Sequence, residues 1–166
     1  MTARSAFFAV AGLTAFVLAA TEAHHAGALT LVRLGLCGAA LGIAAATDMA
    51  ECRIPNRVVL PAVVACGALT LVAGAGATVL WGLALPALFL GVSLARPAAL
   101  GMGDVKLALL IALGLDGHAP SALLLGVALA ACAGVLLLIS RGRAAWRRSL
   151  PLAPFLATGA LLALLQ

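Results

Sequence analysis

Two aspartates stand at the edges of long apolar runs and could work together as a pair of catalytic acids. Asp48 ends the run LGIAAATD, and Asp104 begins the run DVKLALLIAL. If two carboxylates come close, like-charge repulsion lets them share a single proton. One of them can then take a proton from water while the other gives a proton to a leaving amine. This is the chemistry of aspartic proteases, and it needs no metal.

The residues in front of Asp104 favour a close approach of another chain. They read LGMGDVKL, with Gly101 and Gly103 preceding the acid. Glycine adopts backbone angles that other residues avoid, and it leaves space for a neighbour. Asp104 is expected at a helix start, where free N–H groups and the helix dipole favour a carboxylate. A simple capped loop explains these local features equally well. Lys106 either balances the charge of the pair or marks the edge of the membrane, and we favour the edge.

A tight turn is expected shortly after Asp48. The chain continues MAECRIPNRVVLP, in which Ile54, Pro55 and Asn56 form the turn and a new helix starts near Asn56 or Arg57. This turn returns the chain into the membrane just after Asp48.

The elements that must position these residues are apolar helices. The chain has 166 residues, of which 65% are hydrophobic and 9% charged, against about 25% charged in soluble domains. We therefore predict an all-α, polytopic membrane helical bundle. The net charge of +5 does not indicate nucleic-acid binding, because most arginines lie in short loops. Seven transmembrane helices are expected, at about 6–21, 29–47, 58–75, 78–95, 105–117, 120–140 and 151–165. No polar linker separates them, so residues 1–166 are predicted to form one membrane-embedded domain.

The basic residues predict the orientation of these helices. With a cytoplasmic N-terminus, all basic residues except Arg33 fall on the cytoplasmic side, together with Asp48, Glu51 and Asp104. Glu22 and Asp116 fall in outer loops, where we expect them to be solvated. The first run is alternatively a signal peptide, whose removal leaves the other six helices oriented as before.

Neither a metal site nor a disulfide framework is indicated by the cysteines. The four cysteines form no CxxC pair and have no nearby histidine, and three of them lie in apolar runs: Cys37, Cys52, Cys66 and Cys132. We interpret them as small buried apolar side chains, and no cofactor is expected.

Three segments in order resemble the type IV prepilin peptidases, which are GxGD-type aspartic proteases of the bacterial inner membrane. The first segment is D-MAECR-IPN-RVVLP, which begins with Asp48, and the second is GMGDVKL. The third is PLAPFLATGALLAL, which resembles the family's Pro-Phe-Gly-Pro-Phe-Leu but departs from it at Leu152 and Ala153. The resemblance covers about residues 36–166. It implies that Asp48 and Asp104 are the catalytic pair, in a six-helix core preceded by one further helix. It also implies cleavage of the short basic leader of pilin-like precursors at the cytoplasmic membrane face.

One departure concerns methylation. Larger members carry a cytoplasmic segment with paired CxxC motifs that is associated with methylating the new N-terminus. This chain resembles the short, peptidase-only form, without a methyltransferase domain.

Two other functions fit paired acids in an apolar chain. A small transporter or proton channel predicts acids near the middle of the membrane and often an internal repeat. A non-catalytic assembly protein of a pilus or secretion apparatus predicts no shared site for the two aspartates. The sequence leaves the oligomeric state open.

Overall fold

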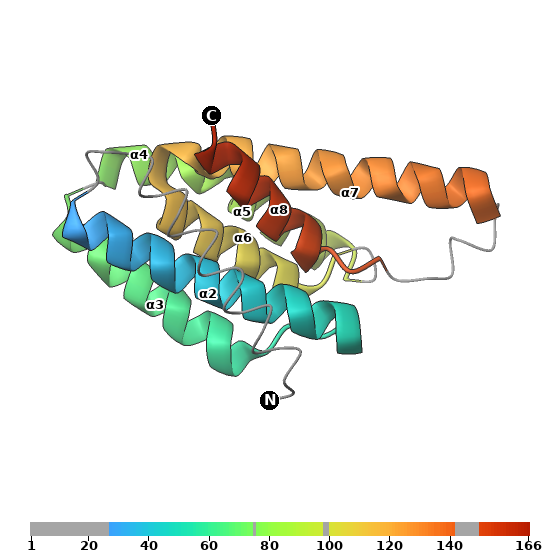
Figure 1. Cartoon of the computed structure of the whole chain (residues 1–166), viewed down its shortest axis with the longest axis horizontal. Coiled ribbons are helices and arrows are strands. Elements are labelled where there is room, and N and C mark those ends of the chain that lie inside the picture. The colour runs from blue at the N-terminus through green and yellow to red at the C-terminus, as the bar shows by residue number, and fades with distance from the viewer. Residues whose placement is uncertain (1–26, 75, 98–99, 142–149) are drawn as a thin grey trace.

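The structure is a computed structural model, and it describes residues 27–74, 76–97, 100–141 and 150–166. All regular elements in these ranges are helices (Figure 1). The expected helix at 6–21, its alternative as a signal peptide and most of the basic segment before the last helix lie outside the described residues.

The helix positions agree with the expected runs to within a few residues, apart from one division. The run expected at 78–95 is divided at Leu83 into two helices. The described elements are α2 (Ala28–Glu51), α3 (Asn56–Val72), α4 (Gly76–Gly82), α5 (Ala84–Ala95), α6 (Met102–Leu115), the 3-10 turn η1 (Asp116–His118), α7 (Ala119–Arg141) and α8 (Ala153–Leu164).

The count of seven membrane spans is not reproduced. By length and apolar composition, two helical stretches in the described ranges can cross a membrane, namely Ala28–Glu51 and Met102–Ser140. Three shorter apolar helices accompany them, Asn56–Val72, Val79–Ala95 and Ala153–Leu164. The described ranges thus contain five apolar helical stretches instead of seven, for two reasons. The first expected span lies outside these ranges, and η1 joins α6 and α7 without a break. Figure 1 shows that α6 and α7 nevertheless run in opposite directions.

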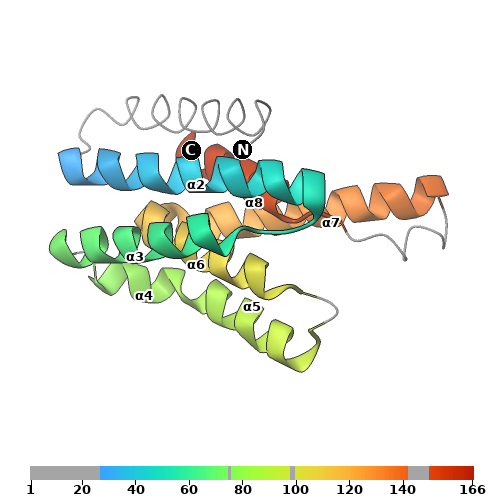
Figure 2. The same ribbon diagram turned by 90° about the horizontal axis from the view of Figure 1, so that it is seen from below.

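Helix α6 is the central element of the bundle. It contacts α2, α3, α5, α7 and α8, and it lies between α2 and α5 in Figure 2. Leu107, Leu110 and Ile111 on α6 are fully buried. Large apolar side chains cover the outside instead, including Leu71, Trp81 and Ile139, each about four-fifths exposed. An apolar surface of this kind suits contact with lipid rather than water.

Small residues let the helices cross at very short distance. A Cβ atom added to Gly114 on α6 would lie 2.4 Å from the Cys37 sulfur on α2, and one added to Gly159 on α8 would lie 2.4 Å from the Gly126 nitrogen on α7. Such crossings are typical of helices packed in lipid. Cys37 and Cys66 are buried as expected, but Cys52 and Cys132 are exposed.

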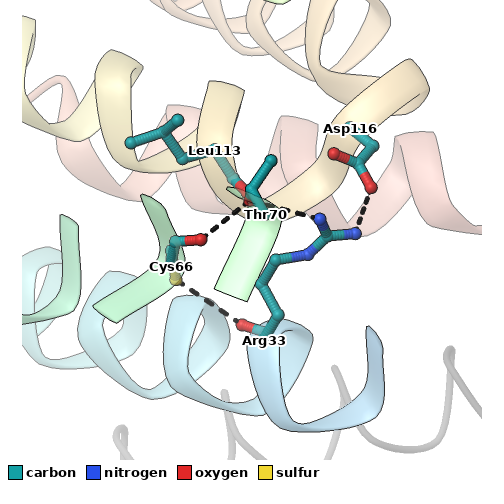
Figure 3. Close-up of polar contacts among 5 residues, drawn as sticks. All are labelled: Arg33, Cys66, Thr70, Leu113 and Asp116. Atoms are coloured by element: carbon teal, nitrogen blue, oxygen red, sulfur yellow. Dashed lines mark hydrogen bonds and ion pairs between the residues drawn. The ribbon is translucent and has the colours of Figure 1, made fainter. Parts of the chain in front are cut away.

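A buried polar network closes one end of the bundle and corrects the expectation for Asp116. Arg33 on α2 is only 4% exposed, and its guanidinium forms an ion pair with Asp116 of η1 and donates a hydrogen bond to Thr70 of α3 at 3.2 Å (Figure 3). The Thr70 hydroxyl lies 2.9 Å from the Leu113 carbonyl oxygen, to which it donates. Asp116 is therefore not a solvated loop residue, and Arg33, the one basic residue against the expected orientation, has its charge neutralised inside the protein.

Candidate active site

Asp48 and Asp104 lie near each other at the opposite end of the bundle. Asp48 is in the last turn of α2, and Asp104 is in the first turn of α6. These helices pack against each other, and the two carboxylates are close enough for the negative charge of Asp48 to act on Asp104. Asp48 is buried, with 7% of its surface exposed, whereas Asp104 is partly buried. The fold thus brings together two acids that are far apart in the sequence.

The start of α6 is built around the Asp104 carboxylate. Gly101 is the N-cap residue, with an extended backbone, and its carbonyl accepts a hydrogen bond from the Asp104 N–H at 3.1 Å. A Cβ atom at Gly101 would lie 3.4 Å from Asp104 Oδ2, at the short limit of ordinary van der Waals contact. The helix dipole favours a negative charge at this position.

The turn after Asp48 begins with a left-handed residue. Cys52 has φ 49°, and its N–H donates to the Asp48 carbonyl at 2.9 Å, which ends α2. Pro55 then serves as the N-cap of α3 with an extended backbone, and its carbonyl accepts the Val58 N–H at 3.1 Å. Proline fixes φ near its observed −74°, so the chain reverses within a few residues and α3 returns alongside α2, as expected.

Two contacts fasten this turn to the start of α6. A Cβ atom at Gly103 would lie 2.9 Å from Ile54 Cδ1 and 3.0 Å from Ile54 Cβ. Lys106 Nζ donates a hydrogen bond to Asn56 Oδ1 at 2.9 Å. The segments that carry Asp48 and Asp104 are therefore joined by an apolar contact and a polar one.

These contacts change the explanation for two predicted residues. Among the described glycines, only Gly74 has a positive φ, so Gly103 is not needed for an unusual backbone angle. It is needed because Ile54 lies against it. Lys106 was interpreted as a marker of the membrane edge, but it also links α6 to the turn through Asn56.

The start of α8 adds a contact that sequence reasoning missed. The backbone N–H of Ala153 donates to Asp48 Oδ2 at 3.0 Å in a buried position. The donor is a main-chain group, so residue types at this position give little sign of it. Within the described ranges, no group of three or more His, Cys, Asp or Glu side chains is placed to hold a metal ion.

The fold and the site together define a helical, membrane-embedded protein with a carboxylate pair at one end. A comparison with protein families makes this specific, because the model of the type IV leader peptidase family matches residues 35–139. This match covers well over half of the chain and includes both aspartates and the turn. The chain therefore belongs to the type IV leader peptidase family and is a membrane protease. No curated protein and no solved structure matches it.

Proposed function

We propose that this protein is an aspartic endopeptidase that cleaves the short basic leader from pilin-like precursors, with Asp48 and Asp104 as its catalytic pair. The observation that carries the proposal is the placement of the two acids in the terminal turns of two helices that pack against each other, one at the end of α2 and the other at the start of α6. Within the described residues neither acid forms an ion pair, and two such neighbouring acids can hold one proton between them. The family match supports a pilin-like precursor as the substrate.

The reaction follows from the pair. One carboxylate takes a proton from a water molecule while the water oxygen attacks the scissile carbonyl carbon, and the other carboxyl group protonates the carbonyl oxygen. The tetrahedral intermediate then collapses. The C–N bond breaks, and the leaving amine receives a proton from the pair. One water is consumed, and a new carboxyl group and a new amine are formed.

The charge around the site supports a cytoplasmic position in the bacterial inner membrane. Arg53, Arg57 and Lys106 lie on the segments next to the two aspartates, and positively charged loops stay in the cytoplasm. Arg33 lies at the other end, where Asp116 neutralises it. We further propose a peptidase-only activity, since the four cysteines of the chain form no CxxC pair.

The transporter alternative loses support from the position of the acids. A transporter site near the bilayer midplane would place acids toward the middle of the helices. Asp48 and Asp104 instead lie in terminal turns of α2 and α6.

Co-expression with a precursor tests the proposal. The precursor carries a basic leader, a glycine and a long apolar helix, and its size is followed by immunoblotting. We expect the natural chain to shorten it at the end of the leader, and Asp48→Asn and Asp104→Asn each to abolish this cleavage. A precursor that stays intact with the natural chain, or that is cleaved by either variant at the natural rate, would overturn the proposal.

A further inference from the structure

The first turn of α8 lacks a capping side chain of its own. Its N-cap residue is Leu152, which makes no side-chain capping hydrogen bond and has no polar atom with which to make one. The first N–H groups of any helix have no acceptor within that helix. Because the start of α8 is buried, with Ala153 only 1% exposed, these groups need partners inside the protein.

Each N–H group in this turn can be accounted for. Pro154 has none. The Phe155 N–H donates to the Leu152 carbonyl at 3.1 Å. The Ala153 N–H remains, and it donates to Asp48 Oδ2 at 3.0 Å. Asp48 therefore caps α8 from a different helix, 105 residues away in the sequence.

Helix α8 is a firm support for this contact. It packs against α2 and α7, and Leu156 in its first turns is fully buried. At Gly159, the α7 backbone is so close that an added Cβ would lie 2.4 Å from the Gly126 nitrogen. Closely packed helices move little relative to one another, so the Ala153 N–H is held at a fixed place in the bundle.

We propose that the backbone N–H of Ala153 is a positioning group for Asp48, and this inference rests on the peptidase function proposed above. The terminal torsion of an aspartate is broad when nothing holds it. The hydrogen bond fixes Oδ2, and the dipole of α8 attracts the same carboxylate. Oδ1 is thereby left available for water and the shared proton. The start of α8 is thus a third component of the site, beside the end of α2 and the start of α6.

A main-chain donor is present whichever residue other than proline occupies position 153. The contact with Asp48 therefore does not depend on the side chain of Ala153.

Replacing Ala153 by proline removes the donor and tests the inference. Proline suits the first position of a helix, and Ala153→Gly is the matched control because it alters the side chain but keeps the N–H. With purified full-length protein and the precursor described above, we expect kcat of Ala153→Pro to lie at least about tenfold below that of Ala153→Gly, as for loss of a group that orients a catalytic residue. KM should be the same in both.

Equal kcat values in the two variants, with an active natural chain, would overturn this inference and leave the proposed function intact. Failure of the natural chain to cleave would instead count against the function.

Hydrogen exchange at the start of α8 tests the contact without using activity. Asp48→Asn keeps an oxygen that can accept the Ala153 N–H, whereas Asp48→Ala removes the acceptor. Because a lost helix cap loosens the first turn, we expect the Ala153 amide to exchange about tenfold faster in Asp48→Ala than in Asp48→Asn. Equal exchange in the two variants would overturn the inference, even if Ala153→Pro fails to fold.

Discussion

Helix α2 carries a charged residue toward each end, facing α6 at one end and η1 at the other, and the two ends of the bundle use these residues differently. At one end, Arg33 of α2 pairs with Asp116, directly after α6. At the other end, Asp48 of α2 lies near Asp104 of α6, and both are acids. Arg33 and Asp48 are about 22 Å apart along the axis of α2, at 1.5 Å per residue. The two ends of α2 thus hold an ion pair with η1 and a pair of acids with α6.

This difference separates structural from chemical use of buried charge. In the described ranges, Arg33–Asp116 is the only ion pair. Arg33 Nε and Asp116 Oδ1 are buried there without hydrogen-bond partners, so cancellation of charge rather than complete hydrogen bonding characterises this end. Two like charges give no such cancellation, and keeping them close is unfavourable unless a proton or a substrate is shared. An acid pair that the fold keeps together is therefore expected to be functional.

Substitution of the acids should give the largest contrast between the two ends. Asp48→Asn and Asp104→Asn remove proton transfer, and we expect each to lower kcat for precursor cleavage by about 10²–10⁴-fold. The double variant should be little worse than either single one, because the two acids act as a unit. Asp116→Asn is the comparison at the other end and should retain cleavage by the folded protein. Loss of cleavage in correctly folded Asp116→Asn would show that the two ends are not functionally distinct.

Breaking the ion pair should affect stability rather than chemistry. Arg33→Met leaves Asp116 without its partner, and we expect the free energy of unfolding in detergent to fall by about 3 kcal/mol. Replacing both residues, as Arg33→Met with Asp116→Asn, should recover most of this loss, because no buried charge is left unpaired and asparagine tolerates the positive φ of this position. Thermal unfolding monitored by circular dichroism provides the measurement. A double variant less stable than Arg33→Met would contradict the view that charge cancellation is the role of this end.

The packing of Gly103 against Ile54 should have an intermediate effect on the catalytic end. Gly103→Val places a branched side chain where Ile54 already lies, and overpacking of this kind costs about 1–3 kcal/mol. Because the strain falls between the two segments that carry the aspartates, we expect cleavage to suffer more than folding. Combining the milder Gly103→Ala with Ile54→Ala should restore cleavage relative to Gly103→Ala alone. If the second substitution brings no recovery, the contact with Ile54 is not the reason for the glycine.

The hydrogen bond from Lys106 to Asn56 should contribute least. It is exposed, and exposed polar contacts are worth up to about 1 kcal/mol. Lys106→Met should therefore reduce cleavage by no more than about fivefold, with Asn56→Ala having a similar effect and the double variant adding little. Initial rates of precursor cleavage distinguish these cases. A hundredfold loss in Lys106→Met would place the lysine in the chemistry itself and not merely in the link between segments.

The features predicted well from sequence depend on local residue patterns. Apolar runs predicted most of the helices, and the Ile54-Pro55-Asn56 and GMGD stretches located the turn and the start of α6, because proline, glycine and aspartate each restrict the backbone locally. The contacts that were missed join distant segments. Arg33 and Asp116 are 83 residues apart, and each taken alone fits an ordinary loop or helix-end residue.

The role of α8 was missed for a different reason. Its contact with Asp48 uses a main-chain N–H, which every residue except proline possesses. The only local sign was indirect: Leu152 stands where a capping side chain such as serine or aspartate is usual. A helix start that lacks a cap indicates that an acceptor comes from elsewhere, but it does not identify which acid provides it.

The distance in sequence between Asp48 and its partner has a consequence for biosynthesis. At about 5–20 residues per second, the ribosome makes the Ala153 amide roughly 5–20 s after Asp48, since 105 residues separate them. Throughout that interval α2 can already be inserted while its acid has no support from α8. Under the positioning role proposed for the Ala153 N–H, a new molecule reaches full activity only after α8 has docked, because Asp48 gains this hydrogen bond at that point.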